Sequence, residues 1–133
     1  MPTNRPVILI AEDNEPNREL IQRRLERRGY IAAVVCNGRE AVDYVLREPP
    51  DVILMDLEMP VMSGFDALQA IRDLEAAPNC PCFALTAHAT AEIRRRCEMA
   101  GFDAFLTKPI DFKELINVLG EFDVLEPRRA QGA

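Results

Sequence analysis

Five short apolar runs alternate along the chain with segments of helical periodicity, and this alternation limits the possible folds more than any other feature. The runs cover residues 7–11, 31–35, 52–55, 82–85 and 104–106. Continuous apolar runs of this length are typical of strands buried on both faces, as in a parallel sheet covered by helices. We therefore expect a five-stranded parallel sheet.

Apolar residues at helical spacing follow each run. The clearest stripe follows Asp111, with Glu114 placed to complete a capping box, and consists of Phe112, Leu115, Ile116 and Leu119. The other stripes are Leu20, Ile21 and Leu25; Ala41, Val42, Val45 and Leu46; Leu68, Ile71 and Leu74; and Ile93, Cys97 and Ala100. Residues that favour helix ends stand beside them: Pro16, Gly29, Asn37 and Gly101.

A strand followed by a helix, five times over, predicts an α/β three-layer sandwich with right-handed crossovers. The 133 residues suit one domain, because single domains commonly have ~100–200 residues. We expect a single domain over residues 1–133 with an ordered core at about 6–122. Frayed ends at 1–5 and 126–133 are expected, the latter within a short C-terminal tail that carries no effector domain.

Composition excludes several classes of protein. The 22 acidic and 16 basic residues give a net charge of −6, which disfavours direct binding to nucleic acid. The longest apolar run, residues 31–36, is far shorter than the ~20 residues of a membrane helix. One histidine and four cysteines without a CxxC pair do not make a zinc site. With no secretory signal, we expect a cytoplasmic protein with free thiols and no membrane association.

Polar residues stand where four of the expected strands end. Glu12 and Asp13 follow the first run, Asp56 follows the third, Thr86 the fourth and Lys108 the fifth. Open parallel sheets bind ligands at the carboxyl ends of their strands. Taken singly, each residue has a simpler interpretation as a helix cap, a strand end or a solvated loop residue. Their common position favours a site.

The chemistry of this set points to phosphoryl transfer. Carboxylates without histidine or cysteine ligands favour a hard cation such as Mg²⁺, and Lys108 adds a fixed positive charge. A carboxylate beside a cation, an ammonium and the Thr86 hydroxyl can attack phosphorus and form an aspartyl phosphate. The cation and the lysine would then neutralise the phosphoryl oxygens.

The motifs together resemble the response-regulator receiver domain of two-component and phosphorelay signalling, over about residues 7–122. They are Ile-Ala-Glu-Asp-Asn at 10–14, Asp-Leu-Glu-Met-Pro at 56–60 with Met62 and Gly64, Leu-Thr-Ala at 85–87 and Thr-Lys-Pro-Ile at 107–110. The resemblance, to chemotaxis regulators in particular, implies a flavodoxin-like sheet of order 2-1-3-4-5 with five helices.

The resemblance also implies a role for each site residue. Asp56 would be the phosphoacceptor and Lys108 the partner of the phosphoryl group. Asp13 and Asp56 would bind Mg²⁺, or Mn²⁺ in its place, directly. Glu12 would act through water, and the Glu58 main-chain carbonyl would complete the protein ligands. No other cofactor is implied.

Further residues are implied to form the switch. The Lys108–Pro109 bond would be cis, and Thr86 would bond the phosphoryl group. Thr86 would thereby vacate space for Phe105, which stands at the family's aromatic switch position. Because this residue is Phe and not the frequent Tyr, it offers no hydroxyl contact. The alternative is that Phe105 is a permanently buried core residue. Ala87 leaves the phosphoryl site open to water or to a partner.

The implied function is a phosphoacceptor switch and not a turnover enzyme. A histidine kinase or histidine phosphotransfer protein would phosphorylate Asp56, and the surface of the fourth helix, fifth strand and fifth helix would change. The opening of the first helix, residues 13–18, resembles receivers that exchange phosphate with phosphotransfer domains. Leu20 or Ile21 would contact that partner, while the other faces the sheet. The downstream target is an unknown protein, and we expect a monomer or weak homodimer.

Three alternatives remain open at this stage. A Mg²⁺-dependent aspartyl-nucleophile phosphohydrolase of the haloacid dehalogenase type would usually carry Asp-x-Asp on its first strand, whereas Glu12-Asp13 stands here. A degenerate receiver used only for protein binding would lack an acidic residue or the lysine. The chain can also be a receiver module excised from a hybrid histidine kinase. The Arg94–Arg95–Arg96 run is interpreted as a solvated helix face.

Overall fold

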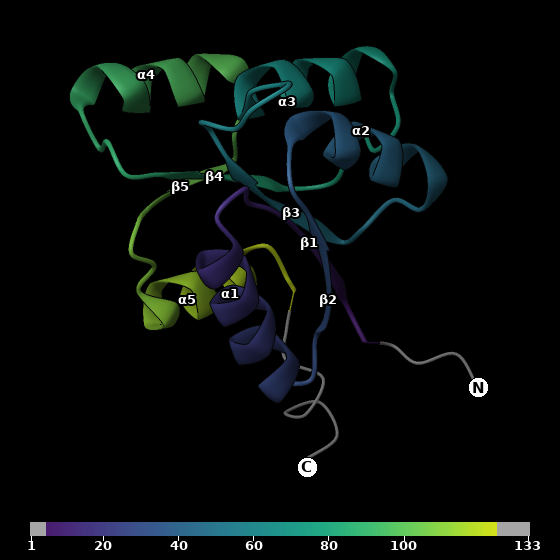
Figure 1. Ribbon diagram of the computed structural model, residues 1–133, viewed down its shortest axis with the longest axis vertical. Coiled ribbons are helices and arrows are strands. Elements are labelled where there is room, and N and C mark those ends of the chain that lie inside the picture. The colour runs from purple at the N-terminus through teal and green to yellow at the C-terminus, as the bar shows by residue number, and fades with distance from the viewer. Residues whose placement is uncertain (1–4, 125–133) are drawn as a thin grey trace.

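The computed structural model describes residues 5–124, in which five strands and five helices strictly alternate (Figure 1). The strands are β1 (Val7–Ala11), β2 (Ile31–Val35), β3 (Val52–Asp56), β4 (Cys82–Thr86) and β5 (Ala104–Thr107). The helices are α1 (Glu15–Arg27), α2 (Gly38–Arg47), α3 (Gly64–Asp73), α4 (Ala91–Ala100) and α5 (Phe112–Glu121). The expected frayed ends and tail, apart from Arg5 and the two residues after Phe122, lie outside the described residues.

All strands are parallel, in the order β2-β1-β3-β4-β5, as the resemblance implies. Helices α1 and α5 cover one face of this sheet, and α2, α3 and α4 cover the other (Figure 1). Because the strands are parallel, their carboxyl ends lie along one edge of the sheet. The five β-to-α loops therefore start at that edge.

Burial on both faces accounts for the continuous apolar runs. In β1, Leu9 packs into the cluster beneath α2, α3 and α4, whereas Ile8 and Ile10 pack into the cluster beneath α1 and α5. All three are fully buried. Successive side chains of a strand point to opposite faces, so a strand between two helical layers needs apolar residues at every position.

Each helix begins at a side chain that accepts a hydrogen bond from a backbone N–H group in its first turn. These N-cap residues are Asn14, Asn37, Ser63, Thr90 and Asp111. Such a cap stabilises a helix by about 1 kcal/mol. At the other end of α4, Gly101 has a φ of +98°, the left-handed conformation that ends many helices.

The apolar residues at helical spacing are not all buried, and two exposed ones lie at helix ends. Leu46 and Leu74 are 53% and 55% exposed, because they lie in the last turn of α2 and just after α3. On α1, Ile21 faces the core at 4% exposure and Leu20 is half-exposed, which settles which of the two points outward. None of the helices within residues 5–124 has both the length and the apolar character needed to cross a bilayer.

Candidate functional site

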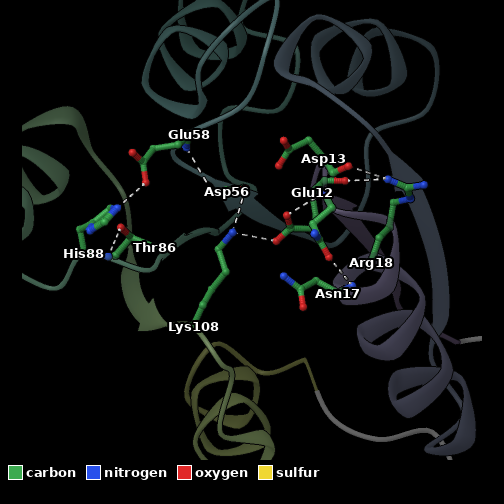
Figure 2. Close-up of polar contacts among 10 residues, drawn as sticks. Glu12, Asp13, Asn17, Arg18, Asp56, Glu58, Thr86, His88 and Lys108 are labelled. Atoms are coloured by element: carbon green, nitrogen blue, oxygen red, sulfur yellow. Dashed lines mark hydrogen bonds and ion pairs between the residues drawn. The ribbon is translucent and has the colours of Figure 1, made fainter.

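Side chains from four strand ends converge at the carboxyl edge of the sheet (Figure 2). Glu12 and Asp13 follow β1, Asp56 ends β3, Thr86 ends β4 and Lys108 follows β5. Glu12, Asp56 and Thr86 are at most 1% exposed and are the buried polar or charged residues of the described chain. The sheet thus brings together the residues that the sequence singles out.

Lys108 bridges the two buried carboxylates. Its Nζ donates to Oε1 of Glu12 at 3.0 Å and to Oδ2 of Asp56 at 2.9 Å. These partners lie 96 and 52 residues away in the sequence. Charge-assisted hydrogen bonds of this length between buried groups are strong, so Lys108 fixes the ends of β1 and β3 relative to β5.

Backbone N–H groups hold the other oxygens of the same carboxylates. Glu12 Oε2 accepts from the Asn14 backbone N–H at 3.1 Å, and Asp56 Oδ1 accepts from that of Glu58 at 3.1 Å. Both carboxylates are therefore oriented before any ligand binds. No sequence feature indicates the Asn14 contact, because it depends on the path of the loop after β1.

Burial raises the pKa of Asp56 to about 7, although the hydrogen bond from Lys108 acts against this shift. The negative charge of Glu12 acts in the same direction as burial. Burial by itself would lower the pKa of Lys108, but its hydrogen bonds to Asp56 and Glu12 leave that pKa raised. Lys108 is thus held as a cation between Glu12 and Asp56, and burial makes the ionisation of Asp56 unfavourable.

The acidic side chains are close enough to share one cation. One carboxylate oxygen each from Glu12, Asp13 and Asp56 lies within 4.8 Å of the others. Three carboxylates beside one lysine leave an excess of negative charge, and all ligand atoms are oxygen. This donor set fits Mg²⁺, which prefers one or two carboxylates with waters and phosphate oxygens.

A hollow of about 600 Å³ opens beside these residues. Its polar lining includes Asp13, Thr86 and His88, and Met59 and Phe65 contribute apolar walls. The Thr86 Oγ1 accepts from the His88 backbone N–H at 3.0 Å, which leaves the hydroxyl hydrogen able to donate. The hollow, which Leu57 and Glu58 just after Asp56 also line, is thus open to a small molecule or to a side chain of a partner.

Two exposed side chains pair across the mouth of this hollow. His88 Nε2 lies 3.5 Å from Oε1 of Glu58, and both side chains are about two-thirds exposed (Figure 2). His88 lies two residues after Thr86, and no feature of the sequence indicates this contact. An exposed side-chain contact of this kind contributes at most about 1 kcal/mol.

Phe105 on β5 is partly buried and packs beside the core under α4. The guanidinium carbon of Arg94, on α4, lies 4.6 Å from the centroid of the Phe105 ring. The ring is therefore not enclosed in the core as the alternative interpretation required. Arg94 belongs to the arginine run of α4, and Arg96 of the same run lies 4.4 Å from the centroid of the Phe65 ring, so two members of the run pack on aromatic rings. The Lys108–Pro109 peptide bond is cis.

Comparison with known proteins gives the same picture. The family described as the response regulator receiver domain matches residues 8–120. Sensor protein GacS of Pseudomonas syringae pv. syringae is 42% identical over 86% of this chain and 13% of its own length. The polar-differentiation response regulator DivK of Brucella anthropi is 32% identical over 86% of this chain and 94% of its own length.

A solved structure of the receiver domain of sensor histidine kinase PA1611 from Pseudomonas aeruginosa PAO1 superposes with a TM-score of 0.82. It is 36% identical over 89% of this chain and 97% of that chain, and it holds a magnesium ion in its active site cleft. This chain spans only 7% to 16% of the sensor kinases that it matches, such as the regulatory protein RpfC of Xanthomonas campestris and a hybrid kinase of Dictyostelium discoideum. With its flavodoxin-like fold and this match over most of its length, the chain belongs to the response regulator receiver domain family of two-component signalling.

Proposed function

We propose that this receiver domain accepts a phosphoryl group on Asp56 from a histidine kinase or a histidine phosphotransfer protein. The observation that carries the proposal is the arrangement of Asp56 itself. The carboxylate is buried, bonded to Lys108, and within 4.8 Å of the oxygens of two further carboxylates, and the two residues that follow it, Leu57 and Glu58, line an open hollow. Such an arrangement orients one oxygen nucleophile toward phosphorus while positive charge stands beside it.

Residues of this chain suited to hold Mg²⁺ are Asp13 and Asp56, with the Glu58 main-chain carbonyl. Glu12 acts through a bound water, as the family resemblance implies; its two oxygens accept hydrogen bonds from Lys108 and from the Asn14 backbone. When bound, Mg²⁺, or Mn²⁺ in its place, neutralises the phosphoryl oxygens. The magnesium ion in the receiver of kinase PA1611 supports this assignment by homology.

In the transfer step an Asp56 oxygen attacks phosphorus, the P–O bond forms, and the P–N bond to the donor histidine breaks. The electron pair of that bond stays on the leaving imidazole nitrogen, which takes a proton from solvent. Lys108 stands 2.9 Å from Asp56 and supplies positive charge to the phosphoryl oxygens. Each domain accepts one phosphoryl group in this step, and the aspartyl phosphate is hydrolysed afterwards. The domain therefore acts as a switch.

The proposed output is a shift of α4, β5 and α5. A phosphoryl group on Asp56 adds about −1.5 to −2 charges and attracts the Thr86 hydroxyl. Movement of Thr86 leaves space on the side of β5, into which Phe105 can turn, and this turn would disrupt its stacking with Arg94. Phosphorylation thereby biases two existing arrangements of this face. An unidentified protein would read the face, with the domain a monomer or weak homodimer in the cytoplasm.

The phosphoryl donor is proposed to dock beside α1. Half-exposed Leu20 lines a small groove of about 60 Å³ together with Ile110 and Phe112, next to Glu12 and Lys108. An apolar patch adjoining a buried charged site suits a protein that must bring a phosphohistidine to Asp56. The same site chemistry applies to a separate regulator and to a receiver within a hybrid kinase.

The test is incubation with Mg²⁺ and a small phosphodonor such as phosphoramidate, followed by intact mass measurement. We expect one phosphoryl adduct per chain with Mg²⁺ and none in excess EDTA. Continuous release of product from a small phosphoester, with many turnovers per chain, would instead establish the phosphohydrolase. Absence of any adduct from both small donors and a phosphorylated phosphotransfer domain would leave the binding-only receiver as the function.

Replacing Ala87 with Tyr is expected to slow dephosphorylation severalfold. Ala87 is exposed next to Thr86, so a large side chain here covers the approach of water to the aspartyl phosphate. The measurement is the decay of the mass adduct after removal of the donor. Ala89→Tyr, at an exposed position of the same loop, is the control. An unchanged decay rate in Ala87→Tyr would refute the idea that this site is open to water.

A further inference from the structure

A guanidinium group on α1 lies against the backbone of the acidic pair. Arg18 Nη1 donates to the carbonyl oxygen of Glu12 at 3.0 Å and approaches that of Asp13 at 3.4 Å (Figure 2). Its Nη2 lies 3.8 Å from the carboxylate of Glu15, which is exposed. The Arg18 side chain is only 14% exposed although it comes from a surface helix. Arg18 is thus directed at the loop after β1 and not at solvent.

The two acidic side chains of this loop are restrained very differently. The Glu12 carboxylate is fixed through both oxygens, by Lys108 and by the Asn14 backbone N–H. Asp13 is exposed, and within residues 5–124 its carboxylate accepts no hydrogen bond. The direction of the Asp13 side chain therefore depends on the orientation of its own backbone, which Arg18 contacts.

We propose that Arg18 is a positioning residue for the divalent-cation site. The guanidinium donates hydrogen bonds to the backbone carbonyl oxygens of Glu12 and Asp13. These bonds fix the backbone from which Asp13 presents its carboxylate to the cation. The inference rests on the proposed function, since it concerns the cation of the phosphorylation site. A planar guanidinium with several donors can hold two carbonyls at once, whereas a lysine ammonium offers a point charge on a flexible stem.

Positioning and charge predict opposite effects on cation binding. The positive charge of Arg18 repels a cation, so if charge alone mattered, its removal would tighten Mg²⁺ binding, and lysine would behave as arginine does. If Arg18 acts by positioning, both lysine and an uncharged side chain weaken Mg²⁺ binding, because neither restrains the two carbonyls. This difference in sign makes the proposal testable with two substitutions.

The experiment measures Mg²⁺ binding by calorimetry for the whole chain and for Arg18→Lys and Arg18→Met. Thermal unfolding of each protein in EDTA is measured in parallel. We expect the Kd for Mg²⁺ to rise about five- to tenfold in both variants, the scale of one lost hydrogen bond of ordinary strength. Arg23→Met, at an exposed position of the same helix, is the matched control and is expected to keep the original Kd.

Each other outcome counts against the proposal. Tighter binding in Arg18→Met with an unchanged Arg18→Lys would show an effect of charge alone. Lower thermal stability with unchanged Kd values would show that Arg18 only stabilises α1. If the unaltered protein binds Mg²⁺ and the variants match it, the role of Arg18 is rejected and the proposed function stands. If the unaltered protein binds no Mg²⁺, both fail.

Discussion

The Asp56→Asn variant is expected to form no phosphoryl adduct and, without metal, to be more stable than the unaltered protein above pH 7. The amide offers no carboxylate oxygen to attack phosphorus. It also stays neutral, whereas the Asp56 carboxyl has a pKa raised from 3.8 to about 7 by burial. The folded protein therefore holds this proton more tightly than the unfolded chain does, so stability falls as the pH rises from about 4 to about 7.

Urea unfolding in EDTA at pH 5 and pH 8 measures the effect. At pH 8 we expect Asp56→Asn to raise the free energy of unfolding by about 1 kcal/mol, and at pH 5 by clearly less. One pKa unit corresponds to about 1.36 kcal/mol, but the gain is reduced because Lys108 loses a charged acceptor. The stabilisation would come from removing the charge that the site needs for phosphorylation.

Asp66→Asn is the control, because Asp66 is an exposed acidic residue on α3. It is expected to be phosphorylated like the unaltered protein and to show the same stability at both pH values. An adduct that persists in Asp56→Asn would place the phosphoacceptor elsewhere. An Asn variant that is less stable than the unaltered protein at pH 8 would contradict the effect of burial on this carboxyl.

Much of the fold could be predicted because the central strands are buried on both sides. In β1 and β3 every residue but Val7 is buried, so the apolar runs coincide with the strands to within one residue. Asn37 and Asp111 cap helices as their side chains suggest. Burial of Leu46 and Leu74 was overestimated, because periodicity alone does not show where a helix leaves the sheet.

The positions of Glu12, Asp13, Asp56, Thr86 and Lys108 were predictable for a simple geometric reason. Parallel strands end at one edge, so residues at strand ends meet there whatever their distance in the sequence. The strand order itself came from the family resemblance, because apolar runs do not specify which strands are neighbours.

Contacts of long side chains were not predictable in the same way. The bonds of Arg18 to backbone carbonyls, the His88–Glu58 pair and the stacking of Arg94 on Phe105 all depend on loop paths and rotamers. An arginine run on a helix is compatible with a solvated face, and nothing in its spacing indicates that two of its members, Arg94 and Arg96, cover aromatic rings. These contacts restrain residues around the site, whereas the residues at the strand ends form the site itself.

Replacing Gly64 with Ala is expected to damage both stability and phosphorylation. Gly64 is the first residue of α3, and its backbone N–H donates to the Leu57 carbonyl at 3.0 Å. An added Cβ would collide with the carbonyl oxygen of Asp56 and lie 3.0 Å from the Leu57 Cα. These neighbours are backbone atoms and cannot rotate away, so α3 or the end of β3 must shift.

We expect Gly64→Ala to lose about 1–3 kcal/mol of unfolding free energy, the usual cost of overpacking. The displaced end of β3 also moves the Asp56 carboxylate relative to Lys108, so adduct formation with a small phosphodonor and Mg²⁺ should be at least severalfold slower.

Gly120→Ala is the matched control, because a Cβ on this α5 residue would meet nothing within 4 Å. Alanine suits a helix interior better than glycine, so the control should gain up to about 1 kcal/mol. Unfolding in urea and the rate of adduct formation test both variants, and a Gly64→Ala protein that matches the original in both would show that the end of β3 tolerates displacement.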